Sequence, residues 1–160
     1  MSEVRIVDAA FLDAMSEAAR ALPRLRRNFN FHASENDACN RLLNAVEPGS
    51  YVRPHRHADR GKDETFVVVR GRFGFVAFDD AGGVTLAAVV AAGSDRCVVN
   101  VPHGTYHTLV ALAPGSVFFE AKGGPFMPLS EAEYAPWAPA EGSPGAASFR
   151  ERLEQLFGGC

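Results

Sequence analysis

Cysteine is scarce in this sequence, and the three that occur, Cys39, Cys97 and Cys160, lie far apart without a C-x-x-C pair. This spacing argues against a disulfide framework and against a zinc–thiolate site, so we expect free thiols in a reducing compartment. Positive charge is also in deficit, because 16 basic residues face 19 acidic ones and the net charge is -3. Non-specific binding to nucleic acid, which needs a basic field, is therefore not expected.

Long apolar runs are missing as well, and no uninterrupted stretch reaches the length of a membrane-spanning helix. The first residues, MSEVRIVDAAFLDAM, carry acids throughout and lack the basic-then-apolar order of a signal peptide. We therefore predict a cytoplasmic protein without membrane contact. An apolar fraction of 47% and a charged fraction of 22% are ordinary for a folded chain, and 160 residues suit a single domain.

The residue patterns divide this domain into three zones. Residues 1–43 are predicted to be an N-terminal helical extension, in which Phe11, Met15 and Leu22 recur at helical spacing before the stop at Pro23. This pattern predicts one amphipathic helix that packs on a larger body.

The core of the domain is predicted to span residues 44–122, where short β-type runs alternate with glycine-containing turns. This pattern predicts a mainly β protein, either a sandwich or a small barrel, and Gly71–Gly74 is interpreted as a hairpin turn. Residues 123–160 are expected to lie across the body as an irregular wrap that ends in a C-terminal helix, with Phe149, Leu153 and Phe157 on one face.

The stretch PHRHADRGKDE, residues 54–64, contains candidate metal ligands. If residues 51–57 form a strand, alternation sends His55 and His57 to the same face. Glu64 alternates in the same way with inward apolar residues of the following strand, so it can point into the same interior. The sequence thus supplies two nitrogen donors and one oxygen donor from neighbouring segments.

A fourth candidate ligand is His107, which opens an inward-facing strand pattern in VPHGTYHTLV. His103 stands four residues earlier, but Pro102 and Gly104 flank it and favour a turn over a helix. The alternative for each histidine is an ordinary polar or surface residue. Because four of the five histidines fall in these two segments, metal binding is the favoured interpretation.

These residues resemble the two motifs of the cupin superfamily. The first motif is matched by the spacing of Gly49, His55, His57, Glu64 and Gly71, and the second by the spacing of Pro102, Gly104 and His107. More narrowly, the chain is similar to the WbuC-type cupin-fold metalloproteins, small bacterial proteins associated with surface-polysaccharide gene clusters. The similar stretches are RRNFNFH, PGSYVRPHRH, KDETF, FEAKGGPF and YAPWAP, which fall within residues 26–139.

The resemblance implies a cupin-type jelly-roll β-barrel, flanked by the N-terminal and C-terminal helices, with a divalent metal ion inside. Three imidazoles and one carboxylate suit Fe, Mn, Ni, Co or Zn, and the ligand types do not choose among these metals. Around the ion, Tyr51 and Arg53 could point inward at the barrel mouth, and His103 could fix the tautomer of a ligand. The alternative for Arg53 and His103 is a solvated side chain, which is the favoured interpretation for Lys62 and Asp63.

A second group of candidates lies in RLRRNFNFH, whose polar residues could bind an anionic sugar or a carboxylate. Its members are Arg26, Arg27, Asn28, Asn30 and His32. The alternative is that the arginines only complement a helix C-terminus.

Three functions remain open for this sequence. The first is a metal-dependent enzyme, of isomerase, epimerase or oxygenase type, that acts on a sugar or sugar-nucleotide derivative in surface-polysaccharide biosynthesis. The second is a non-catalytic binding module for a polar or anionic small molecule. The third is an interaction protein with a structural metal, which forms a homodimer through strand edges. No residue is assigned a catalytic role.

Overall fold

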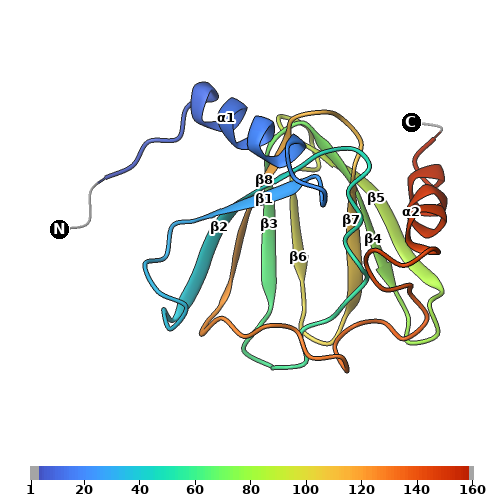
Figure 1. Ribbon diagram of the computed structural model, residues 1–160. Coiled ribbons are helices and arrows are strands. Elements are labelled where there is room, and N and C mark those ends of the chain that lie inside the picture. The colour runs from blue at the N-terminus through green and yellow to red at the C-terminus, as the bar shows by residue number, and fades with distance from the viewer. Residues whose placement is uncertain (1–3, 159–160) are drawn as a thin grey trace.

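The computed structural model describes residues 4–158, which form two helices and eight strands in this range. The helices are α1 (Ala9–Arg20) and α2 (Ala146–Gln155). The strands are β1 (Arg26–Asn30), β2 (Cys39–Val46), β3 (Glu64–Arg70), β4 (Arg72–Phe78), β5 (Val84–Ala91), β6 (Val98–Val101), β7 (Tyr106–Ala111) and β8 (Ser116–Gly123). A mainly β protein with one helix near each end is therefore confirmed (Figure 1).

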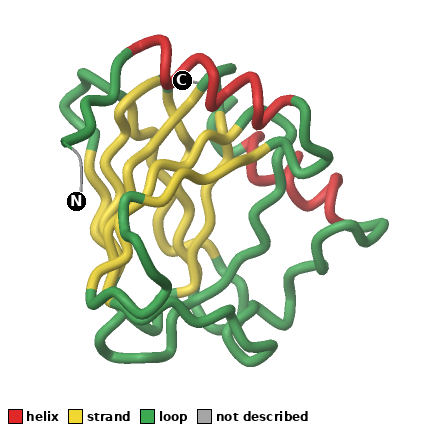
Figure 2. Tube along the Cα trace, turned by 60° about the vertical axis from the view of Figure 1, so that its left-hand side comes forward, coloured by secondary structure: helices red, strands yellow, loops and turns green. Residues whose placement is uncertain are grey.

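The strands form two antiparallel sheets with the orders β1-β2-β8-β3-β6 and β5-β4-β7. In the described part of the chain no strand ladder joins the two sheets, so the closed barrel expected from the resemblance is not seen. Many connecting segments gather beyond one end of the strands, at the bottom of Figure 2. Neither helix within residues 4–158 is long and apolar enough to cross a membrane.

The main core lies between the two sheets, where β3 turns alternate side chains inward and β4 and β7 are buried along nearly their whole length. Its buried members come from both sheets and include Phe66, Phe73, Phe75, Leu109 and Phe118. Phe118 contacts Phe66 edge-on, with ring centroids 5.1 Å apart. Fully burying one such aromatic side chain stabilises a fold by about 1.5–3 kcal/mol.

The helices cover the outer faces of the sheets (Figure 1). Helix α1 packs Met15 and Ala19 on Leu43 and Val117 of the five-stranded sheet. Arg70 fastens the helix, because its guanidinium donates to the Leu12 carbonyl at 2.9 Å. Helix α2 and the segment around residues 135–138 pack on the three-stranded sheet in the same manner.

The sheet starts earlier in the chain than the sequence indicated. Residues 26–30 and 39–46 are strands, whereas they were expected to belong largely to a helical extension that ended at residue 43. Phe29 packs under Phe11 of α1, with the ring centroids 5.0 Å apart. Phe29 thus faces the helix, and Arg26, Asn28 and Asn30 are on the opposite face of β1.

Gly71 separates two strands that never pair, so the predicted hairpin turn at Gly71–Gly74 is wrong. Strand β3 pairs with β6 and β8, and β4 pairs with β5 and β7. Gly71 makes the corner at φ 73°. A Cβ atom there would come within 2.2 Å of the Ser116 side chain and 2.9 Å of its backbone. Only glycine suits both the conformation and the close approach.

We predict that Gly71→Ala destabilises the protein more than Gly93→Ala does. Both glycines have positive φ, at 73° and 69°, but a Cβ at Gly93 meets nothing within 4 Å. The left-handed conformation alone costs about 1–2 kcal/mol, and the overlap with Ser116 adds about 1–3 kcal/mol. Thermal unfolding of the two variants checks the difference, and equal melting temperatures would contradict the corner's tight packing.

Candidate metal centre

The first two candidate ligands lie on an extended segment rather than on the strand expected for residues 51–57. His55 makes an isolated β-bridge with His107, in which the two residues exchange N–H···O bonds of 3.1 and 2.9 Å. A second bridge joins His55 to Tyr134. The alternation that sends His55 and His57 the same way is kept, although no continuous ladder holds them.

Three of the predicted ligands offer donor atoms that converge. One donor atom each of His55, His57 and Glu64 lies within 4.8 Å of the others. Two ligands on opposite sides of one ion are about 4.2 Å apart, at bond lengths near 2.1 Å. The cluster is therefore slightly wider than a closed coordination sphere and contracts little to hold an ion.

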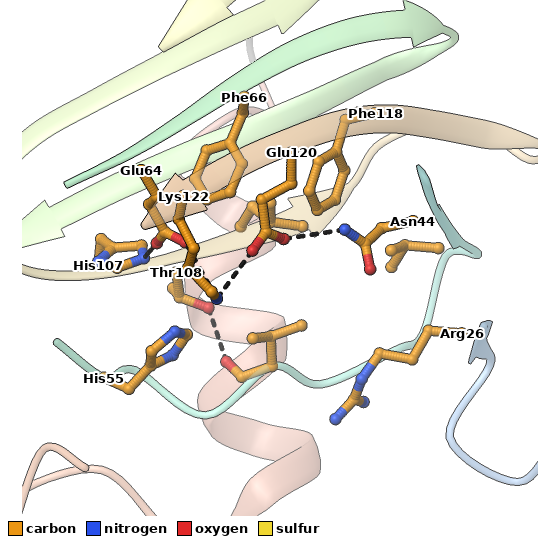
Figure 3. A pocket seen from close by; sticks show the side chains of 13 residues that line it. Arg26, Asn44, His55, Glu64, Phe66, His107, Thr108, Phe118, Glu120 and Lys122 are labelled. Atoms are coloured by element: carbon orange, nitrogen blue, oxygen red, sulfur yellow. Dashed lines mark hydrogen bonds and ion pairs between the residues drawn. The ribbon is translucent and has the colours of Figure 1, made fainter. Parts of the chain in front are cut away.

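His107 reaches the same carboxylate from strand β7. The His107 Nε2 atom lies 2.6 Å from Glu64 Oε1 (Figure 3). His57 Nε2 lies 3.3 Å from Glu64 Oε2. The ring centroids of His55 and His107 are 4.7 Å apart. His107 thus adjoins the group of His55, His57 and Glu64 through the Glu64 carboxylate.

Backbone carbonyls orient two of the imidazole rings. His55 Nδ1 lies 3.0 Å from the Arg53 carbonyl, and His107 Nδ1 lies 2.9 Å from the Thr105 carbonyl. Because a carbonyl oxygen only accepts, each Nδ1 carries a proton, and the Nε2 lone pair of a neutral ring faces the cluster. This arrangement is typical of histidines that bind a metal through Nε2.

Burial sets the charge of the donors. Removal from water lowers the pKa of His55 to about 3, and the neighbouring His107 adds to the effect, so His55 is neutral near pH 7. Burial alone would raise the pKa of Glu64, but the contacts with His107, His57 and Lys122 outweigh it and hold that pKa well below its usual value. A neutral imidazole and a charged carboxylate are the forms that a metal ion requires.

Three buried donor atoms have no hydrogen-bond partner, namely His57 Nε2, His107 Nε2 and Glu64 Oε1. A buried polar atom without a partner costs about 1–3 kcal/mol. Two electron-rich atoms 2.6 Å apart, such as those of His107 and Glu64, need a proton or a cation between them. A cation held beside Glu64, where donor atoms of His55 and His57 also lie, would supply such a partner. The residues present therefore fit a divalent metal.

Strand β8 adds charged residues that were not expected at the site. Lys122 Nζ lies 2.8 Å from Glu120 and 3.6 Å from Glu64, and Asn44 donates to Glu120 at 2.9 Å (Figure 3). Burial lowers the pKa of Lys122, but the two carboxylates outweigh it, so the net shift is upward and the amine stays charged. The signal was the alternation in VFFEAK, where Glu120 and Lys122 share a face with the core residue Phe118.

These side chains line a cavity of about 150 Å³ between the sheets (Figure 3). His55, Glu64 and His107 lie at one end, and Arg26 lies at the other. Phe66 and Phe118 line the cavity beside Glu64 and Glu120 of the same two strands, so polar and apolar side chains are adjacent in its lining. Such a cavity suits a small compound with both polar and apolar faces.

A second, wider pocket of about 390 Å³ shares His55 and Arg26 with this cavity. Arg53 lies there, with its guanidinium 4.8 Å from the Tyr134 ring and a donated bond to the Ala135 carbonyl at 3.3 Å. Tyr51 does not face this pocket, because its hydroxyl donates to the Pro139 carbonyl at 2.8 Å. Burial raises the pKa of Tyr51 to about 12.

The remaining candidates lie elsewhere. His103 is in the predicted turn, and its ring pairs with Asp63 at 2.8 Å, outside the metal cluster. Arg27 is exposed on the face of β1 opposite Asn28 and Asn30, which line a third pocket with His32. The structure therefore divides the polar group expected at residues 26–32.

Lys62 contradicts the expectation of a solvated loop side chain. It is buried, and its amine donates to the Pro125 carbonyl at 2.5 Å and to the Gly123 carbonyl at 3.4 Å. Its charge ties the loop before Glu64 to the chain that follows β8.

Solved structures with a similar fold include KdgF from Halomonas sp., with a TM-score of 0.51 and 20% identity over 67% of this chain and 85% of that chain. A conserved protein of unknown function from Streptococcus pyogenes has a TM-score of 0.53 and 10% identity, over 79% and 93% of the two chains. A cupin superfamily protein from Desulfitobacterium hafniense has a TM-score of 0.48 and 12% identity, over 61% and 76%. The two neighbours with TM-scores above 0.5 show a shared fold. Membership of the cupin superfamily and the narrower WbuC-type likeness stay predictions from the sequence.

Residues 7–90 match a family described as a domain of unknown function, DUF6016. The match spans more than half of the 160 residues, and the chain belongs to this family. No curated protein sequence matches the chain.

Glu141, which lines the wider pocket, makes the stability of the protein depend on pH. Glu141 accepts hydrogen bonds of 2.8 and 2.9 Å from Arg24 and one of 2.8 Å from Arg26. Burial would raise the pKa of Glu141, but these bonds outweigh it and lower that pKa. A lowered pKa stabilises the fold above the ordinary value near pH 4.3, and the stabilisation is lost as the pH falls through the folded-state pKa.

We therefore expect Glu141→Gln to melt below the parent protein at pH 7, and the gap to close as the pH falls below about 4. The Glu141 side chain is 35% exposed, so the gap corresponds to less than about 1 kcal/mol. Glu131→Gln is the control, because the Glu131 side chain is 90% exposed and its carboxylate makes a long contact of 3.8 Å with Arg53. A gap that stays constant from pH 7 to pH 3 would show that the charge of Glu141 is not its source.

Proposed function

We propose that this protein binds one divalent transition-metal ion through His55, His57, Glu64 and His107, and that the centre acts on a small polar compound. The observation that carries the proposal is the group of three buried donor atoms, on His57, Glu64 and His107, that converge without hydrogen-bond partners. His55 completes the set from the adjoining segment.

The donor set is consistent with Fe, Mn, Ni, Co or Zn. An ion held there supplies Lewis acidity, which polarises a substrate oxygen or lowers the pKa of a bound water. Four protein ligands leave positions open in an octahedral sphere, and the cavity adjoins the donors on the side of Lys122. The site therefore suits an ion that substrate can approach.

The side chains of the cavity bind and orient the substrate. The Lys122 ammonium donates to a polar group of the substrate while the paired Glu120 accepts from a hydroxyl. Phe66 and Phe118 form the apolar part of the lining and exclude water from the polar contacts. A sugar or sugar-nucleotide derivative, which carries both hydroxyls and C–H groups, fits this mixed lining, and the reaction is of isomerase, epimerase or oxygenase type.

The resemblance to the WbuC-type proteins supports a role in surface-polysaccharide biosynthesis. The jelly-roll barrel, the homodimer, the cytoplasmic location and the small-molecule partner likewise stay predictions from the sequence.

We predict that His55→Ala or His107→Ala lowers the metal content of the purified protein about tenfold or more while the chain stays folded. Elemental analysis of protein purified without a metal-leaching resin measures the content. His103→Ala is the matched control, because its ring pairs with Asp63 and lies outside the cluster. A chelator should also lower the melting temperature of the parent protein, since the ion binds only the folded chain. Equal metal in His107→Ala and in the parent would overturn the assignment.

We further predict that protein loaded with Fe(II) or Mn(II) converts a nucleotide sugar, and that Lys122→Met reduces kcat at least tenfold without changing the metal content. Product formation from a panel of nucleotide sugars is measured by chromatography. Retained metal separates a loss of substrate orientation from a loss of the ion. Absence of turnover with every loaded metal would contradict the enzymatic part of the proposal.

A further inference from the structure

A row of side chains crosses three neighbouring strands and leads away from the metal cluster. Glu64 of β3 is opposite Lys122 of β8, and Lys122 is opposite Asn40 of β2. All three face the same side of the five-stranded sheet. The row therefore links the metal centre to a third pocket of about 200 Å³, in which Asn40 takes part.

Asn40 is the unusual member of this pocket. Only 2% of its surface is exposed, and neither its Nδ2 nor its Oδ1 atom has a hydrogen-bond partner. Buried amides in folded proteins are nearly always bonded, and each missing bond costs about 1–3 kcal/mol. Because the amide lines a pocket, it can bind a ligand that both donates and accepts hydrogen bonds.

The other walls of the pocket offer the same pair of functions. Asn28 Nδ2 donates to Asn30 Oδ1 at 2.7 Å, so the Asn28 carbonyl and the Asn30 amino group remain as its acceptor and donor. His32 and Glu35 add polar groups, and Phe126, which is 41% exposed, adds an apolar surface. Hydroxyl groups, which donate and accept at once, match such amides.

The charges of the pocket argue against an anionic ligand. The ammonium of Lys122 is paired with Glu120 at 2.8 Å, and Glu35 contributes a further carboxylate. No arginine of the described chain lines the pocket, because Arg26 is bonded to Glu141 on another side and Arg27 is on the opposite face of β1. The pocket therefore favours a neutral compound rich in hydroxyls.

We infer that Asn28, Asn30, Asn40 and Phe126 form a second ligand site, distinct from the metal centre, that binds one neutral sugar ring. The three amides hydrogen-bond to the hydroxyls of the sugar, and the apolar face of the sugar packs on the Phe126 ring. This site shares only Glu120 and Lys122 with the lining of the metal cavity. Its existence does not depend on the metal, although a sugar chain bound here would extend toward the ion.

Saturation-transfer NMR tests the inference with D-glucose, D-galactose and N-acetyl-D-glucosamine, on metal-loaded and on chelator-treated protein. We expect at least one of these sugars to bind both forms with similar affinity, and D-glucuronate to bind more weakly. Binding of D-glucuronate alone would overturn the choice of a neutral ligand. Binding that vanishes with the metal would assign the sugar to the metal centre and overturn the second site.

The Asn40→Leu variant separates ligand binding from stability. Because no hydrogen bond is lost, we expect its melting temperature to be unchanged or raised, while sugar binding weakens at least tenfold. Phe126→Ala should weaken binding several-fold, whereas Leu86→Ala, also at an exposed apolar residue, should leave it unchanged.

Unchanged binding in Asn40→Leu, or no binding of any neutral sugar to the parent protein, would show that the pocket holds only water. If Asn40→Leu does not fold, the exposed Asn28→Ala takes its place. Weaker binding in that variant supports the site, and unchanged binding overturns it.

Discussion

The negative charge of Glu64, buried between two sheets, has to be balanced inside the protein. His57 and His107 approach its two oxygens at 3.3 and 2.6 Å, and Lys122 stands 3.6 Å away. A carboxylate taken out of water without such partners would cost several kcal/mol. The balance explains why a lysine and a second carboxylate, Glu120, occur on the core-facing side of β8. The candidate metal centre depends on this one requirement.

Apolar side chains pack next to the charged residues Glu64, Glu120 and Lys122 and do not separate them from one another. Phe66 and Phe118 continue the same faces of β3 and β8 that carry Glu64 and Lys122, so each strand changes from polar to apolar within two residues. The apolar end provides the stability, and the polar end provides the chemistry. Helices α1 and α2 cover the outer faces and leave the interior of the sheets to the ligand sites.

Local patterns of the sequence predicted much of this arrangement. The period of two in residues 64–70 and 106–111 correctly sent Glu64 and His107 inward, because side-chain direction in a strand depends only on the residue count. The pairing of strands is not local, and for that reason the meeting of Asn40, Lys122 and Glu64 could not be foreseen. The hairpin turn predicted at Gly71–Gly74 failed for the same reason. A glycine between two strands looks the same in the sequence whether the strands pair with each other or belong to different sheets. Lys62 was placed in solvent because its partners are backbone carbonyls some sixty residues later in the chain.

The four donors differ in how firmly the backbone holds them. Glu64 and His107 are on strands within continuous ladders, whereas His55 and His57 are on a segment attached by isolated bridges to His107 and Tyr134. A few backbone hydrogen bonds can therefore open without loss of the sheets. An ion held as proposed would therefore exchange through local opening of the segment with His55 and His57, without unfolding of the sheets.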